Sequence, residues 1–243
     1  MRKILLFISL IALFSDVQAQ TVPCLPPTSS IDLDINNVRA VIHNGGDMWM
    51  NRDISRAQYE IPKGSGIHTM FAGAIWIGGL DANGQLKLAA TRFRSNGDDF
   101  WPGALKTKDG STSLMDCYNQ DKHHKMNYFE VEEFRKRYND SNYKIPSSIL
   151  NYPAHGLVEK GFAQYLAPFV DVDGDGIYNP QKGDYPAFDF NNSLDCDDKL
   201  YGHQSIWWVF NDNGNIHSET GGMPIGIEIQ AQAFAFMADD EIN

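Results

Sequence analysis

Short apolar runs separated by turn residues recur along this chain, and they predict β-strands. The clearest run covers residues 69–80; the turn Asp81-Ala-Asn-Gly84 follows, and a second run covers residues 86–93. Asn-Gly between two such runs is typical of a β-hairpin, because both residue types tolerate positive φ. The last run, residues 225–237, alternates apolar residues with glutamate and glutamine. That alternation predicts a half-buried strand with one face toward water.

Further strands are predicted on the same grounds. Residues 38–42 form a short β-like run, and residues 59–61 form another. Residues 206–210 are strongly apolar and aromatic, and an Asn/Asp/Gly turn follows at 211–214. We therefore expect a second hairpin, whose return strand lies near residues 216–217.

One segment has a helical period instead. Apolar residues recur at helical spacing from Tyr128 to Tyr138, and Asn127 precedes them as a candidate N-cap with Glu130 three positions on. Glutamates lie early in the segment, and arginine and lysine lie late, which suits the helix dipole. We predict a mainly β fold of antiparallel, sandwich-like sheets with long loops and one inserted helix at about residues 127–138.

The first nineteen residues have the pattern of a signal peptide. Arg2 and Lys3 precede an apolar run at residues 4–14, and Val17-Gln-Ala19 forms a small-residue cleavage site before Gln20. No later run reaches the roughly 18 apolar residues that a membrane helix needs. We expect a secreted or cell-surface chain without a transmembrane segment.

The rest of the chain is expected to consist of a short leader and one domain. Residues 20–35 are rich in proline and serine and are interpreted as an extended leader. Residues 36–243 are interpreted as one β-rich domain, because 42% hydrophobic residues suffice for a packed core. The long last strand is followed only by residues 238–243, so we expect this domain to be truncated at its C-terminus.

The net charge limits the classes of partner, and the cysteine content bears on a possible disulfide. The formal net charge of −11 argues against nucleic acid and anionic membranes as partners and suits a protein that meets cations. Export would permit a disulfide among the three cysteines. We expect a bridge between Cys117 and Cys196, because Cys24 lies in the proline-rich leader.

The most informative motif for chemistry lies at residues 171–184. Three aspartates fall at alternate positions and Gly176 follows at the sixth, where a calcium loop turns sharply. No histidine or cysteine interleaves with these oxygens, which favours Ca²⁺ over a transition metal. The predicted ligands are Asp171, Asp173, Asp175, Ile177 through its backbone carbonyl, Asn179 and Asp184.

This motif departs from the EF-hand pattern. Lys182 occupies the twelfth position, where a bidentate glutamate belongs, and Pro180 disfavours an immediate helical exit. The loop is therefore expected to lie outside a helix–loop–helix frame. The alternative interpretation is a polar Asp/Gly turn that holds no ion.

A second, looser group of oxygen donors follows the first. It contains the possible ligands of another cation: Asp189, Asn191, Asn192, Asp195 and Asp197.

Other chemistries have weaker support. No histidine pair has the spacing of a zinc motif, and no Gly-x-Ser-x-Gly elbow is present. A glycosidase needs only two carboxylates that face each other in space. Candidates are Asp98, Asp99, Glu219 and Glu228, although a solvated loop is the favoured interpretation of Asp98 and Asp99.

Three tryptophans are possible ligand-stacking residues: Trp76, Trp207 and Trp208. Trp207 and Trp208 are adjacent, so on a strand they point to opposite faces. We expect one of the two in the core and the other at the surface or an interface.

Several phrases together resemble a known family. They are Phe71-Ala-Gly-Ala-Ile-Trp-Ile-Gly-Gly79, Tyr152-Pro-Ala-His-Gly156, Asp171-Val-Asp-Gly-Asp-Gly-Ile-Tyr-Asn-Pro180 with Gly183-Asp-Tyr-Pro186, Ile206-Trp-Trp-Val-Phe-Asn-Asp212 and His217-Ser-Glu-Thr-Gly-Gly-Met-Pro-Ile-Gly226. The set resembles the N-terminal region of large secreted surface proteins of Bacteroidetes-type bacteria over roughly residues 36–243. That resemblance implies a longer protein with a C-terminal sorting domain for type IX secretion.

These observations lead to one functional expectation and one alternative. The first is a secreted or cell-surface, calcium-stabilised β-rich module, non-catalytic, that serves adhesion, surface architecture or carbohydrate contact. Its partners would be calcium and an extracellular glycan or surface protein. The alternative is an extracellular polysaccharide-acting hydrolase that uses paired carboxylates.

Overall fold

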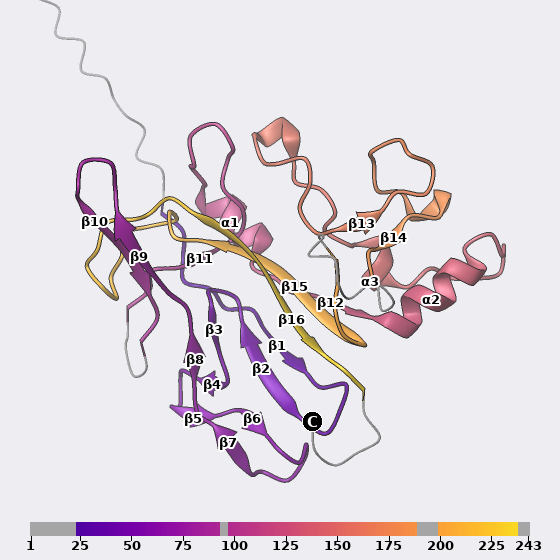
Figure 1. Cartoon of the computed structure of the whole chain (residues 1–243), viewed down its shortest axis with the longest axis horizontal. Coiled ribbons are helices and arrows are strands. Elements are labelled where there is room, and N and C mark those ends of the chain that lie inside the picture. Colours follow the sequence, from indigo (N-terminus) through magenta and orange to yellow (C-terminus); the bar gives the residue numbers. More distant parts are fainter. Residues whose placement is uncertain (1–22, 93–96, 189–198, 238–243) are drawn as a thin grey trace, which may run out of the picture.

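The computed structural model describes residues 23–92, 97–188 and 199–237, and its architecture is mainly β (Figure 1). The predicted signal peptide lies outside these residues. Two antiparallel sheets form the body, a two-stranded hairpin projects from one side, and a lobe of loops and short helices covers the other. Within the described ranges, no helix combines the length and the apolarity that a bilayer crossing requires.

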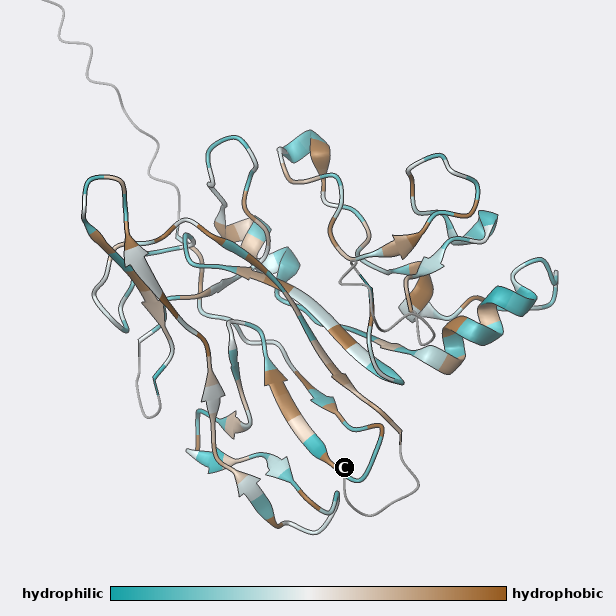
Figure 2. Ribbon diagram, viewed as in Figure 1, coloured by the Kyte–Doolittle hydropathy of each residue, from teal (hydrophilic) through white to brown (hydrophobic). Residues whose placement is uncertain are grey.

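The first sheet is built from short N-terminal strands. Strand β2 lies at its centre and carries hydrophobic residues along its middle (Figure 2). The predicted runs at residues 38–42 and 59–61 correspond to β2 and β6 and are confirmed. The strands are β1 (Ser30–Leu33), β2 (Arg39–His43), β3 (Asp47–Met48), β6 (Tyr59–Glu60), β7 (His68–Met70) and β8 (Gly73–Ala74), with β4 (Met50–Asn51) and β5 (Arg56–Ala57) paired beside them.

The second sheet surrounds one long strand. Its members are β11 (Trp101–Pro102), β12 (His124–Asn127), β15 (Gln204–Asn211) and β16 (Glu228–Ala235). All eight residues of β15 are buried, because both of its faces are covered. β15 pairs with β16 along its whole length, from Gln204 opposite Ala235 to Asn211 opposite Glu228.

The predicted second hairpin is wrong in its return strand. β15 does occupy residues 206–210, but its hairpin-like partner is β16 and not residues 216–217. The Asp212 carboxylate explains the longer connection. It accepts hydrogen bonds from the backbone N–H groups of Ile225, Gly226 and Ile227 at 2.5–2.9 Å, which brings the start of the last strand to the end of β15.

The first predicted hairpin is confirmed at its turn, but the run at residues 69–80 is divided among β7, β8 and β9, and only β9 belongs to the hairpin. β9 (Trp76–Leu80) pairs with β10 (Leu86–Ala90) in antiparallel register. The Asp81 carboxylate closes the turn by accepting the backbone N–H groups of Asn83 and Gln85, each at 2.9 Å. Gly84 has a φ of +77°, the conformation for which the Asn-Gly pair was expected.

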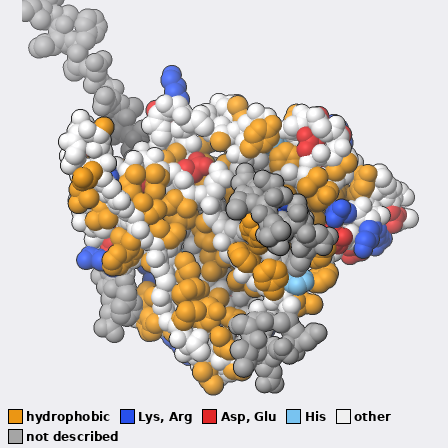
Figure 3. Space-filling model, viewed as in Figure 1, with side chains coloured by type: hydrophobic (Ala, Val, Ile, Leu, Met, Phe, Trp, Pro, Cys, Tyr) orange, Lys and Arg blue, Asp and Glu red, His pale blue; other side chains and the backbone are white. Residues whose placement is uncertain are grey.

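The inserted helix is also confirmed. α2 (Tyr128–Arg137) buries Val131 and Phe134, and its charged side chains gather on the outer surface (Figure 3). Asn127 stands at the N-cap but makes no capping bond; its side-chain oxygen instead accepts from the Gln204 amide at 3.2 Å. The sequence analysis missed strands β3, β4, β5, β11 and β12. It also missed α1 (Leu114–Gln120), α3 (Ser147–Leu150), the 3₁₀ turns η1 (Val158–Lys160) and η2 (Pro180–Lys182), and strands β13 (Phe169–Val170) and β14 (Tyr185–Pro186).

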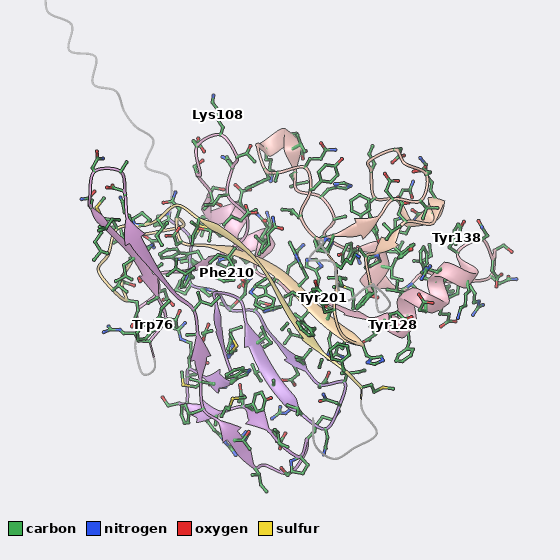
Figure 4. All side chains as sticks on the ribbon, in the orientation of Figure 1. Trp76, Lys108, Tyr128, Tyr138, Tyr201 and Phe210 are labelled. Atoms are coloured by element: carbon green, nitrogen blue, oxygen red, sulfur yellow. A yellow bond between two sulfur atoms is a disulfide. The ribbon has the colours of Figure 1, made fainter. Side chains whose placement is uncertain are left out.

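The two larger hydrophobic cores lie on opposite faces of β15. Trp207 and Val209 belong to the core under the helical lobe, with Phe134 and Phe162. Trp208 and the centrally placed Phe210 belong to the core between the two sheets (Figure 4). The prediction of opposite faces is confirmed. The prediction that one tryptophan is surface-exposed is wrong, because each is only 4% exposed.

The disulfide joins Cys24 to Cys117, with 5.9 Å between the two Cα atoms. The predicted bridge between Cys117 and Cys196 is wrong, because Cys117 is bonded to Cys24; Cys196 itself lies outside the described residues. Cys24 is not in a free leader: its backbone N–H donates to the Gly214 carbonyl at 2.9 Å, and its side chain packs in a small core with Trp101. β1 likewise joins residues 30–33 of the expected leader to the first sheet.

His123 and His124 flank β15 from its two faces, with His123 beside Trp208 and His124 beside Trp207. Burial lowers the pKa of each imidazole to about 4, and the Lys122 ammonium adds to the effect at His124. The folded chain therefore keeps both rings neutral between pH 4 and 6.5, where the unfolded chain binds protons.

We expect the stability associated with His124 to be complete above pH 6.5 and to be lost as the pH falls toward 4. Between about pH 7 and about pH 5 the loss should be roughly 1–2 kcal/mol for this ring, allowing for its partial exposure. Urea denaturation of the native chain and of His124→Gln at both pH values measures this loss in the free energy of unfolding. An equal pH dependence in the two proteins would contradict the assignment.

Candidate metal centre

The aspartate-rich loop at residues 171–184 connects two paired strands. β13 and β14 are antiparallel, with Val170 opposite Tyr185. This pairing holds the first and last residues of the loop side by side. The sequence spacing is thus converted into a closed turn on the lobe that carries α2 and α3 (Figure 1).

Asp184 fastens the loop from inside. Its side chain is fully buried, and its two oxygens accept the backbone N–H groups of Val172 at 2.8 Å and Asn179 at 2.7 Å. These two donors lie on opposite sides of the loop. A single carboxylate therefore fixes the width of the loop while each oxygen retains capacity for a further acceptor interaction.

Asp171 organises the tip of the loop. Its two oxygens accept the N–H groups of Gly174 and Gly176, each at 2.7 Å. Both glycines have positive φ, 73° and 76°, a conformation that other residues adopt only with strain. The N–H of Gly176, more than any other group, lowers the pKa of the Asp171 carboxyl, so this side chain is anionic at neutral pH.

Three carboxylates converge as a result. Asp171, Asp173 and Asp184 each offer one oxygen such that all three oxygens lie within 4.8 Å of one another. They come from the start of the loop and from beyond η2, so the cluster exists only because the loop closes. Of the predicted ligands, these are the carboxylates that the described structure brings together.

The remaining predicted ligands make other contacts. Asp175 accepts the Ile177 N–H at 2.8 Å, and the side chain of Ile177 points to solvent. Asn179 caps η2 by accepting the Gln181 N–H at 3.0 Å. The predicted second cation site, Asp189, Asn191, Asp195 and Asp197, lies outside the described residues.

Lys182 is the functional residue that the sequence analysis missed. Its ammonium lies 2.7 Å from a carboxylate oxygen of Asp173 and 2.6 Å from one of Asp175. These bonds raise the pKa of Lys182 and lower that of Asp175. The signal was present at the twelfth loop position, where lysine was interpreted only as a missing ligand. A cation from the chain itself thus neutralises part of the site.

The donor set is chemically uniform. It consists of carboxylate oxygens, with no nitrogen or sulfur ligand among the three grouped residues. Hard cations with flexible oxygen coordination fit such a set, and Ca²⁺ accepts six to eight oxygens without strict geometry. Backbone carbonyls and water would have to complete the shell, as they do in calcium loops generally.

The candidate carboxylates for hydrolysis have structural contacts instead. Asp99, favoured above as part of a solvated loop, is fully buried and accepts hydrogen bonds from Ala90, Glu219 and Thr220. Glu219 is buried against Arg92, and an oxygen of Glu228 accepts the Leu105 N–H at 2.8 Å. The solvated-loop interpretation is therefore wrong for Asp99.

Of the candidate stacking tryptophans, Trp76 is exposed. It lies on the projecting hairpin with 69% of its surface accessible, and its indole N–H donates to the Thr91 carbonyl at 2.8 Å (Figure 4). Trp207 and Trp208 are core residues, as described above.

Comparisons of this chain with protein-family models, with curated proteins and with solved structures found no match.

Proposed function

We propose that this chain is a calcium-stabilised, non-catalytic β-rich module of a secreted or cell-surface protein, used for adhesion, surface architecture or carbohydrate contact. The observation that carries the proposal is the convergence of Asp171, Asp173 and Asp184 within 4.8 Å. Like charges this close repel one another, and a divalent ion among them removes that repulsion.

In this proposal the bound ion supplies positive charge and no reaction. Asp171 and Asp173 would hold it from the first half of the loop, and Asp184 from the second. Because β13 and β14 follow directly on either side, order in the loop is transmitted to the lobe that they belong to. Binding to the folded chain alone stabilises that chain by mass action.

The secreted setting has its own support. The predicted signal peptide points to export, and a disulfide between Cys24 and Cys117 is typical of oxidising compartments. Millimolar calcium outside the cell would keep even a weak site loaded.

We expect calcium at about 100 times its Kd to add about 2.7 kcal/mol and to raise the melting temperature by about 5–10 °C. Asp173→Asn should abolish the rise, since this side chain is part of the cluster and makes no backbone hydrogen bond in the described structure. The matched control is Asp53→Asn, an exposed aspartate outside the loop. Differential scanning calorimetry, with calcium and with chelator, measures the melting temperatures of the native chain and the two variants.

Lys182→Gln sharpens this test. Removal of the ammonium that neutralises Asp173 and Asp175 should tighten calcium binding and lower the stability of the calcium-free protein. Melting curves that do not respond to calcium or chelator in any of the four proteins would refute the proposed function.

A further inference from the structure

A separate cavity of about 260 Å³ opens between the second sheet and the loops that cover it. Its floor is Trp207 and Val209 of β15, and its apolar walls are Leu157, Phe162 and Leu166. α1, the start of β12 and the segment from residue 151 to residue 166 form the surround (Figure 1). The cavity is distinct from the aspartate cluster, whose carboxylates do not line it.

The rim of this cavity is polar but nearly neutral. Lys160 lies 3.5 Å from the Asp116 carboxylate, so these two charges offset each other. His124 is neutral at physiological pH, because burial lowers its pKa to about 4. The amides of Asn119 and Asn151 add groups that both donate and accept hydrogen bonds.

His155 lines the far wall of the cavity, and its hydrogen bonds define which ring nitrogen carries the proton. The Nε2 atom of His155 accepts the backbone N–H of Tyr178 at 2.8 Å, so Nδ1 carries the proton and donates to the Gln164 carbonyl at 2.8 Å. Both ring nitrogens are thereby occupied and the ring is neutral. His155 contributes shape to the cavity and no charge.

From these features we infer that the cavity binds one neutral sugar ring of an extracellular glycan. A sugar ring has apolar C–H faces, which suit the accessible Leu157 and Leu166 walls above the buried Trp207, and hydroxyl groups that both donate and accept, which suit the amide rim. The volume lies just below the roughly 300–1,000 Å³ of pockets for larger ligands, so it admits a single ring. An anionic ligand fits less well, because Lys122 is the one rim cation without an ion pair among the described residues. A purely apolar ligand also fits less well, because it would leave the polar groups of the rim unpaired.

This inference rests on the proposed function for its extracellular setting and its carbohydrate class, but it does not require calcium. The calcium melting test and the sugar-binding test therefore fail independently. A protein that binds sugar without responding to calcium would overturn the proposed metal site alone.

The first experiment is saturation-transfer NMR with the methyl glycosides of glucose, galactose, mannose and N-acetylglucosamine. We expect transfer to at least one of them. Leu157→Trp should weaken that binding about tenfold by filling the cavity from its rim. Val158→Trp is the matched control, because Val158 is the next residue, is similarly exposed and does not line the cavity. No transfer to any glycoside, or equal binding by the two variants, would overturn the inference.

The second experiment locates the sugar. Fluorotryptophan is incorporated at the five tryptophans, and the Trp207 resonance is assigned through Trp207→Phe. Addition of the glycoside that binds should shift the Trp207 resonance and leave that of the exposed Trp76 unchanged. A shift of Trp76 in place of Trp207 would assign the sugar to the hairpin and reject the cavity.

Discussion

Removal of the Cys24–Cys117 disulfide is expected to lower the free energy of unfolding by about 4 kcal/mol, because the bond closes a long loop in the unfolded chain. The two cysteines are 93 residues apart. The double variant Cys24→Ala/Cys117→Ala should show this loss in urea denaturation. Both side chains are buried, so a small part of the loss comes from packing against Trp101.

The native chain under reducing conditions provides the comparison, since it should approach the stability of the double variant. Cys196→Ala is the control and should retain the Cys24–Cys117 bond, so reduction should lower its stability as it does that of the native chain. A tryptic peptide that links Cys117 to Cys196 would contradict the disulfide described above.

Asp99→Ala is expected to destabilise the fold by a similar amount, about 3–5 kcal/mol. The substitution leaves the buried N–H groups of Ala90 and Glu219, and the half-buried Thr220 hydroxyl, without the carboxylate that they now share. Each such group costs roughly 1–3 kcal/mol when its partner is removed. Chemical denaturation measures the loss.

The neighbouring residue supplies a matched control for Asp99. Asp98 pairs with Arg52 at 3.1 Å near the surface, and Asp98→Ala should cost about 1 kcal/mol or less. Equal losses for the two variants would mean that the buried hydrogen bonds of Asp99 contribute little.

Elements set by local chemistry could be predicted from the sequence. The β9–β10 hairpin follows from the turn at Asp81–Gly84, whose side-chain and backbone hydrogen bonds lie within five residues. α2 follows from the spacing of Val131 and Phe134 on one face. In both cases the decisive contacts are near in sequence, so a local pattern contains them.

Elements set by distant contacts could not be predicted in the same way. The connection after β15 is directed by Asp212, which binds backbone groups thirteen to fifteen residues further along the chain. Cys24 reaches Cys117 because the leader packs beside Gly214. Trp207 and Trp208 are both buried because two separate cores cover the two faces of one strand.

The candidate metal site was predictable in part. Alternate aspartates indicated an oxygen cluster, and three of the predicted carboxylates do converge. The role of Lys182 was not predictable from spacing, because η2 turns the chain so that its ammonium returns to Asp173 and Asp175. The spacing of residues along the chain shows which charged groups are present, but not which of them come into contact when the loop folds.

The position of β15 in the chain has a consequence for the order of folding. This strand lies between the two larger cores, yet it begins only at residue 204, after β1, β2, β11 and β12. Neither core can close until residues 204–211 have been synthesised, because side chains of β15 form part of both. We therefore expect the stability of the fold to be gained late, in the steps that follow the synthesis of β15.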